Sequence, residues 1–343
     1  EMLRSLVGSE MCIRDRFEYV RAGDAAAATA AVAAMPLARF LAGGTNLIDL
    51  MKEDVERPTR LVDIRNLPLR EIQRTRSGLS IGALTTNTET ANHPLVRENY
   101  PLLTQAIVAG ASGQLRNMAT NGGNLLQRTR CNYFYDTAMP CNKREPGTGC
   151  GAREGLNKIH AILGWSESCV ATYPGDMANA LYALDASVRV RGADGRERAI
   201  AIQDFHRLPG DEPHRDNTLE RGDLIVAIDL PVAAGELATH SHYLKVRDRT
   251  SYAFAMVSVA AGLRIEGGAI RQARVVLGSV SHKPWRSQEA ENVLVGQAPS
   301  EQTFRQAADA ALSQARPLAH NAYKVELGKR SVVRALMRAA RLV

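Results

Sequence analysis

Short apolar runs alternate with helical patterns near the start of the chain. The segment "ARFLAGG" (38–44) predicts a strand that ends in a glycine turn, and "TNLIDLMKED" (45–54) has apolar positions at helical spacing. "TRLVDIRNL" (59–67) predicts a second strand. Upstream, Asp24 can cap an alanine-rich helix that extends to about Met35. This order predicts a small βαβ-like unit.

The middle of the chain mixes regular elements with long irregular segments. Strands are predicted in "SGLSIGALTT" (77–86) and in "DLIVAIDLP" (223–231), and "DMANALYAL" (176–184) predicts a helix. Residues 113–178 are rich in Gly, Asn and Thr, which is typical of loops. Residues 204–222 place prolines and a glycine among charged residues and predict a long loop.

The last hundred residues have a pattern of their own. "VAAGELATH" (232–240) is the expected boundary, and three strand-like runs come after it at 242–248, 254–268 and 270–280. The Gly-Gly pair at 267–268 predicts a hairpin between the second and third runs. Two amphipathic helical patterns close the chain. This part therefore predicts a small three-stranded sheet with helices.

Composition narrows the class of protein. The 343 residues are 45% hydrophobic and 23% charged, which is ordinary for globular proteins, and the length suggests two or three domains. The net charge is +7, but basic and acidic residues are interleaved and only 5% of residues are aromatic, so we expect no nucleic-acid binding. No apolar run reaches the ~18–20 residues that span a bilayer, so we expect no membrane span.

Residues 1–16, "EMLRSLVGSEMCIRDR", fit poorly with the rest of the chain. They have no clear period, and "VGSEMCIRDR" resembles a translated sequencing-adapter fragment. We interpret them as a non-native addition and exclude them from fold reasoning. Because Cys12 lies in this segment, the protein proper has four cysteines.

The four cysteines gather in the loop-like part of the chain. Cys131, Cys141, Cys150 and Cys169 are separated by 9, 8 and 18 residues. Seven basic and three acidic side chains lie between residues 116 and 158, and nearby cations favour a thiolate-ligated centre, which is negatively charged. Four thiolates in this segment suit one four-coordinate centre.

Three interpretations of the cysteines compete. Two disulfides would require an oxidising compartment. Structural zinc usually takes cysteines in tight pairs, which this spacing does not provide. A [4Fe–4S] cluster tolerates longer intervals. The residues alone leave zinc and iron–sulfur both open.

Two glycine motifs share one chemistry. "LAGGTNLI" (41–48) and "RNMATNGGNLLQ" (116–127) each place a Gly-Gly pair beside Thr and Asn. Glycine lets a ligand approach the backbone closely, and turn N–H groups can bind phosphate. Neither motif is a dinucleotide fingerprint or a Walker loop. Together they suggest a hypothesis in which two loops hold the two phosphates of a dinucleotide.

These motifs carry a family resemblance. "FLAGGTNLIDLMK", "GASGQLRNMATNGGNLLQ", "YPGDMANAL" and "KVRDRTSYAFAMVSVA" resemble the FAD-binding subunit of molybdenum hydroxylases, the group of xanthine dehydrogenase, carbon monoxide dehydrogenase and aldehyde oxidoreductase. The cysteine segment resembles an insertion in 4-hydroxybenzoyl-CoA reductase and, most closely, in the periplasmic aldehyde oxidoreductase. There it holds a [4Fe–4S] cluster, so the resemblance implies that cofactor beside FAD.

The resemblance implies an α+β fold in two domains. Residues 17–235 would form a two-lobed FAD-binding domain of the p-cresol methylhydroxylase type, with lobes at about 17–72 and 73–235 and the iron–sulfur insertion at about 128–170. Residues 238–343 would form a C-terminal domain like that of the carbon monoxide dehydrogenase flavoprotein.

The resemblance also implies site residues. Asp176 would bind ribityl or ribose hydroxyls, although as an isolated residue it could equally cap the following helix. Ile225 would pack near the isoalloxazine, and Lys245 would lie beside the flavin. Without the resemblance, Ile225 could simply be a core residue of a strand and Lys245 a solvated strand residue. The metal ligands would be Cys131, Cys141, Cys150 and Cys169. The FAD pyrophosphate loops would use Arg39, Phe40, Leu41, Ala42, Gly43, Gly44, Thr45, Asn46 and Leu47, with Arg116, Thr120, Asn121, Gly122, Gly123 and Asn124.

The implied function is electron transfer without substrate chemistry in this chain. Aldehyde oxidation would occur on a large molybdenum-cofactor subunit, and electrons would pass through a small [2Fe–2S] subunit to FAD here and then to an external acceptor. The complex would be a heterotrimer or a multiple of one. The resemblance implies the periplasm, reached by co-export with a partner, with the cytoplasm as alternative. The rivals are a flavin subunit of the 4-hydroxybenzoyl-CoA reductase type and a zinc-stabilised nucleotide-binding protein.

Overall fold

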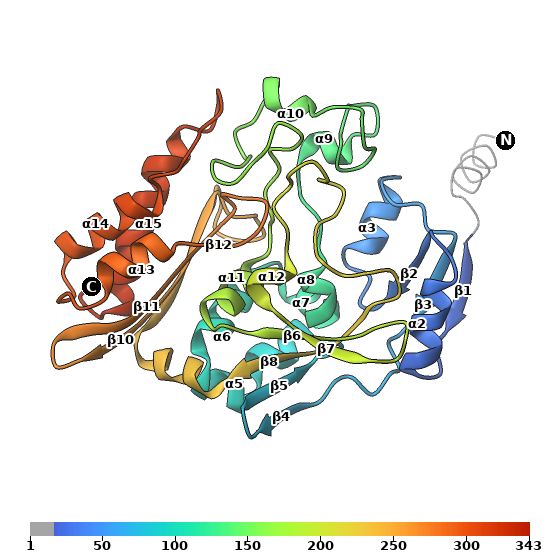
Figure 1. Ribbon diagram of the computed structural model, residues 1–343, viewed down its shortest axis with the longest axis horizontal. Helices are drawn as coiled ribbons and strands as arrows, with labels where there is room; N and C mark the ends of the chain where they lie inside the picture. Colours follow the sequence, from blue (N-terminus) through green and yellow to red (C-terminus); the bar gives the residue numbers. More distant parts are fainter. Residues whose placement is uncertain (1–16) are drawn as a thin grey trace.

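The computed structural model describes residues 17–343, which form two domains side by side (Figure 1). The segment 1–16, interpreted as non-native, lies outside the described residues together with Cys12. Within the described part of the chain, no helix is both long and apolar enough to cross a membrane.

The first lobe is a small parallel sheet. Its strands β1 (Glu18–Arg21), β3 (Arg60–Asp63) and β2 (Ala38–Leu41) lie in that order. The predicted βαβ-like unit is present, because helix α3 (Leu47–Lys52) follows β2 and precedes β3. Strand β1 was not predicted, since it is short and mostly exposed and so has no apolar run.

Helix α2 (Ala25–Ala33) packs on this sheet. The Asp24 carboxylate caps it by accepting a hydrogen bond from the Ala27 N–H at 2.7 Å, as the sequence predicts.

The second lobe is an antiparallel sheet of five strands covered by helices. The strand order is β4 (Ile72–Thr75), β5 (Gly78–Gly82), β8 (Leu224–Pro231), β6 (Ser187–Arg191) and β7 (Glu197–Ala201). Helices α6 (Pro101–Ala109) and α11 (Asp176–Ala183) contribute to the largest apolar core, which also includes buried residues of these strands. The smaller helices are α4 (Asn87–Asn92), α5 (Pro94–Asn99), α7 (Gly113–Met118), α8 (Asn121–Leu125) and α12 (Ile202–Phe205).

The cysteine segment lies at the top of Figure 1, between the first lobe and the C-terminal domain. Its only helices among the described residues are the single turns α9 (Asn132–Tyr135) and α10 (Gly151–Glu154). An apolar cluster of its own includes Leu50, Phe134 and Val170. This cluster is what orders a segment that has little regular structure.

The C-terminal domain has one more strand than the sequence predicts. After the 3₁₀ segment η1 (Val232–His240), its antiparallel sheet has the order β12 (Trp285–Arg286), β11 (Ala269–Gly278), β10 (Val257–Glu266) and β9 (Ser241–Val246). The prediction of three strands was incomplete because β12 has only two residues, which is too short for a periodic signal.

The predicted hairpin joins β10 to β11, with positive φ at both Gly267 and Gly268. Helices α13 (Gln288–Leu294), α14 (Glu301–Ala311) and α15 (Tyr323–Ala339) bury one face of the sheet.

Candidate functional site

The two glycine motifs meet in space. The turn between β2 and α3 approaches the turn between α7 and α8 so closely that a Cβ on Gly43 would lie 1.9 Å from the Met118 carbonyl oxygen. The Thr120 hydroxyl caps α8 by accepting a hydrogen bond from the Gly123 N–H at 3.3 Å. Gly43 is therefore required by the contact between the two loops, and not only by a ligand.

The first glycine turn presents free hydrogen-bond donors. The backbone N–H groups of residues 43–46 donate to no other described residue. The Nδ2 atom of Asn46 is buried and has no partner among the described residues, while its Oδ1 accepts from the Arg128 N–H at 3.1 Å. Because buried donors are almost always satisfied, this turn fits an anionic group such as a pyrophosphate.

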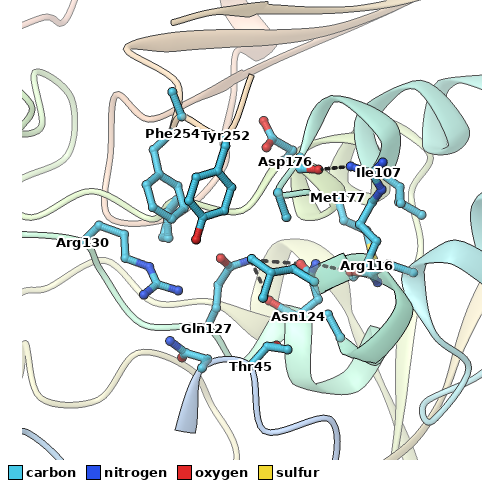
Figure 2. Close-up of a pocket in the computed structure, with 18 of the residues that line it drawn as sticks. Thr45, Ile107, Arg116, Asn124, Gln127, Arg130, Asp176, Met177, Tyr252 and Phe254 are labelled. Atoms are coloured by element: carbon cyan, nitrogen blue, oxygen red, sulfur yellow. Dashed lines mark hydrogen bonds between the residues drawn. The ribbon is translucent and has the colours of Figure 1, made fainter. Parts of the chain in front are cut away.

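Two cavities adjoin the glycine turns, with volumes of about 240 Å³ and about 590 Å³. Thr45, Asn46 and Gly123 line both of them. The smaller cavity is lined by the predicted residues Arg39, Phe40, Ala42, Gly43, Gly44, Thr45, Asn46, Leu47, Thr120, Gly122, Gly123 and Ile225. The larger cavity, drawn in Figure 2, is lined by the predicted residues Thr45, Asn46, Arg116, Gly123, Asn124, Asp176 and Lys245.

Two predicted residues line neither cavity. Leu41 is buried at the end of β2. Asn121 is also buried, where its Nδ2 donates to the Thr90 hydroxyl at 2.7 Å and its Oδ1 accepts from Asn87 Nδ2 at 2.9 Å. Asn121 therefore braces the second glycine turn from behind.

Asp176 lies where the two domains meet. Its carboxylate pairs with Lys245 Nζ at 2.7 Å and accepts from the Tyr243 hydroxyl at 2.6 Å. Asp176 is the first residue of α11, the N-cap is Gly175, and no side-chain cap bond forms. The alternative that Asp176 is simply a helix cap is therefore wrong. Arg116 braces the same wall by donating to the Gly110 carbonyl at 2.6 Å.

Most residues that line the larger cavity were not predicted from the sequence, among them two aromatic residues and an arginine. Tyr252 and Phe254 lie side by side over it in the loop between β9 and β10, and the Arg130 guanidinium points toward it (Figure 2). Arg130 stacks on the Phe254 ring at 5.1 Å and pairs with Asp49 at 2.9 Å, yet its Nε is buried without a partner among the described residues. The aromatic pair lies within one of the resembling motifs, which was the available signal.

A buried ion network connects the first glycine turn to the cysteine segment. Arg128 pairs with Glu56 at 2.7 Å and with Asp216 at 2.8 Å, and Asp216 also pairs with the fully buried Lys143. Burial alone would raise the pKa of Asp216, but Lys143 and Arg128 hold it well below its usual range. Asp216, which lies in the loop at 204–222, therefore neutralises the charges of Arg128 and Lys143.

The four cysteines line one small cavity together with Lys143. All four are free thiols, and Cys141 and Cys150 face each other in an antiparallel backbone bridge. Burial raises the pKa of the Cys131 thiol to about 12 and that of Cys169 to about 11. These thiols stay protonated unless a cation replaces the proton. The structure thus brings the predicted ligands around one point.

The side chains are not arranged as a single-ion site. Among residues 17–343, no group of three or more His, Cys, Asp or Glu side chains could hold a metal ion. The structure therefore shows neither a disulfide pair nor a formed metal site in the described residues.

Two family matches divide the sequence. Residues 15–233 match the FAD binding domain in molybdopterin dehydrogenase, and residues 242–339 match the CO dehydrogenase flavoprotein C-terminal domain. They confirm the predicted fold class and the predicted FAD.

Relatives match over most of the chain. The aldehyde oxidoreductase FAD-binding subunit PaoB of Escherichia coli (strain K12) is 48% identical over 324 residues, which is 94% of this chain and 98% of that protein. The carbon monoxide dehydrogenase medium chain of Hydrogenophaga pseudoflava is 27% identical over 94% of this chain and 97% of its own length.

Solved structures have the same arrangement. Reconstituted CO dehydrogenase from Oligotropha carboxidovorans matches with a TM-score of 0.75 and 25% identity, over 96% of this chain and 99% of that chain. Quinoline 2-oxidoreductase from Pseudomonas putida 86 matches with a TM-score of 0.73 and 26% identity, over 96% and 98% of the two chains. The similarity extends over both domains.

Proposed function

This chain belongs to the FAD-binding subunits of the molybdenum hydroxylase family, and we propose that it is the electron-transfer subunit of a molybdenum-dependent aldehyde oxidoreductase. The 48% identity to an aldehyde oxidoreductase subunit supports the aldehyde class over other substrates of the family. In this proposal the chain itself carries out no substrate chemistry.

The two cavities suggest how the residues of this chain hold FAD. The pyrophosphate would lie at Thr45, Asn46 and Gly123, which line both cavities. The backbone N–H groups of Thr45 and Asn46 and the Asn46 Nδ2 are donors without a partner among the described residues. The larger cavity takes the isoalloxazine, because that ring system is the larger end of FAD, and the smaller one takes the adenine. Lys245 would then lie at the flavin end, as predicted. Ile225 lines the smaller cavity, so this placement departs from the prediction that Ile225 packs near the isoalloxazine. When bound, FAD supplies a carrier that takes up two electrons and releases them singly or as a pair.

The cysteine segment supports a [4Fe–4S] cluster as a second cofactor. Four thiols, three of them buried, line one small cavity with Lys143 on its wall. A cation beside a thiolate cluster offsets the negative charge of the cluster. The described residues contain no group of side chains already arranged to hold a metal ion, so the choice of a cluster over zinc rests on the family resemblance of this segment.

The proposal includes partner subunits and an acceptor. A large molybdenum-cofactor subunit and a small [2Fe–2S] subunit would deliver electrons to the flavin, and an external acceptor would remove them. The names of relatives that are medium chains of carbon monoxide dehydrogenase support an assembly of this kind. The periplasm, reached with a partner subunit, stays the predicted location, and fractionation of cells that produce the complex tests it.

The observation that carries the proposal is the contact between the two glycine turns beside unpaired donors. The purified complex should release FAD in about one equivalent per chain and contain iron and acid-labile sulfide. Its visible spectrum should show flavin bands and a broad absorbance that bleaches with dithionite. A colourless protein that contains zinc would contradict both cofactors, whereas a yellow protein without iron would contradict only the cluster.

A further inference from the structure

The C-terminal domain forms several buried hydrogen bonds to the backbone of the cysteine segment at residues 159–160. Lys324, at the start of α15, is fully buried, and its Nζ donates to the carbonyls of Ile159 at 2.9 Å, His160 at 3.1 Å and Ser279 at 2.8 Å. Asn321 Nδ2 donates to the His160 carbonyl as well, at 3.2 Å. The peptide of His160 is therefore fixed from the neighbouring domain.

The ring of His160 contacts one cysteine. His160 is 1% exposed, and its Nε2 lies 3.1 Å from Cys131 Sγ. Its Nδ1 is buried and has no partner among the described residues. Among residues 17–343, the Cys131 sulfur is the only one of the four that contacts a side-chain nitrogen or oxygen at hydrogen-bond distance, whereas the Cys169 sulfur accepts from the backbone N–H of Ala171.

The neighbours of the ring decide which nitrogen carries the proton. Nε2 faces the Cys131 sulfur, which can accept a hydrogen bond, whereas Nδ1 faces no partner among the described residues. A buried N–H without an acceptor is rarer than a buried acceptor without a donor. The proton therefore belongs on Nε2, where the sulfur can accept it.

We propose that His160 is a positioning residue for the metal group held by Cys131: its Nε2–H donates to the Cys131 thiolate, and Lys324 and Asn321 keep it in place. This inference rests on the proposed [4Fe–4S] cluster. Hydrogen bonds to cluster sulfurs stabilise the reduced, more negative state and so raise the reduction potential. The C-terminal domain thereby influences a cofactor to which it contributes no ligand.

The experiment compares variants in the complete complex, purified with its partner subunits. His160→Leu removes the donor with little change in volume, and His160→Gln keeps an N–H donor. Iron content is measured first, and the midpoint potential of the cluster is then measured by a redox titration followed by electron paramagnetic resonance. His93→Leu is the matched control, because His93 lies at the junction of α4 and α5 and lines no part of the cysteine cavity.

We expect the potential of the His160→Leu complex to be more negative than that of the wild type, with iron content and the His93→Leu control unchanged. Lys324→Met should shift the potential in the same direction by a smaller amount, because it frees the His160 peptide but keeps the ring. A wild-type potential in His160→Leu would overturn the inference. If His160→Leu binds no iron, His160→Gln decides: retained iron supports the donor role, and lost iron overturns it.

The two proposals fail in different ways. A wild-type complex without iron or a cluster signal contradicts the [4Fe–4S] cluster itself. A wild-type complex that has the cluster, together with an unchanged potential in His160→Leu, contradicts only the role of His160.

Discussion

Lys245 on β9 forms an ion pair with Asp176 on α11 at 2.7 Å, across the boundary between the two domains. The side chains are only 5% and 9% exposed, and both line the larger cavity. Because one wall of this cavity consists of a charge from each domain, the proposed flavin end of the site forms only when the domains are docked.

Lys245→Met should destabilise the protein and weaken FAD binding. The substitution leaves the Asp176 carboxylate buried without its cation, and breaking a buried pair from one side costs about 3–5 kcal/mol. Urea unfolding and FAD titration measure the two effects. The double variant Asp176→Asn with Lys245→Met should recover part of the lost stability, because no unpaired charge remains. Equal stability of Lys245→Met and the double variant would show that the unpaired Asp176 carboxylate is not the source of the loss.

Gly43→Ala should reduce FAD occupancy by forcing the two glycine turns apart. The added Cβ would lie 1.9 Å from the Met118 carbonyl oxygen, which is backbone and cannot move aside alone. Gly113→Ala is the matched control, because nothing lies within 4 Å of its Cβ. Flavin fluorescence after denaturation gives the occupancy. Full occupancy in Gly43→Ala would refute the assignment of this turn to the pyrophosphate.

Stability should fall as the pH drops from about 6.5 to about 4, in part because of His206. The His206 Nε2 lies 3.0 Å from the Leu125 carbonyl oxygen. Burial lowers the pKa of His206 to about 4, and Lys283 acts in the same direction, whereas the hydrogen bond to Leu125 and the charge of Asp216 act in the opposite direction. The unfolded chain binds a proton in this range and the folded chain does not, so acid favours unfolding.

The shift in the pKa of His206 corresponds to about 3 kcal/mol. Chemical denaturation at pH 4.5, 5.5, 6.5 and 7.5 measures the slope with and without His206→Gln, which does not titrate. An identical slope in wild type and variant would exclude His206 as the source.

Asp216→Asn should destabilise the protein because it removes the carboxylate that faces both Lys143 and Arg128. Lys143 is fully buried, so its charge loses its counterion in a place that water does not reach. We expect a loss of about 3–5 kcal/mol in the free energy of unfolding, measured in urea. Glu212→Gln is the control on the same loop, because its pair with Arg207 is exposed, and it should leave the stability unchanged.

Cys141→Ser should remove iron from the complex while FAD remains bound. Cys141 lines the cysteine cavity but neither of the two cavities assigned to FAD. Ser168→Ala changes another residue of the same cavity wall without removing a thiolate and should keep its iron. Elemental analysis and the flavin spectrum measure both cofactors. Wild-type iron content in Cys141→Ser would remove this residue from the ligand set.

The sequence determined the local elements and the chemistry that each could carry. Asp24 marked the start of α2, branched residues marked β8, and the Gly-Gly pair at 267–268 marked the hairpin, because each of these signals depends only on neighbouring residues. The glycine motifs suggested a dinucleotide, and the family resemblance implied that this dinucleotide is FAD.

Only the tertiary structure decided how these pieces meet. The approach of Gly43 to Met118, the pairing of Asp176 with Lys245 and the contact of His160 with Cys131 join residues that lie far apart in the sequence. The sequence could not assign Asn121 to the supporting side of its turn, because the direction of a side chain depends on what packs against it. Charges and donors that look solvated in a linear sequence acquire their roles only when folding removes water and supplies their partners.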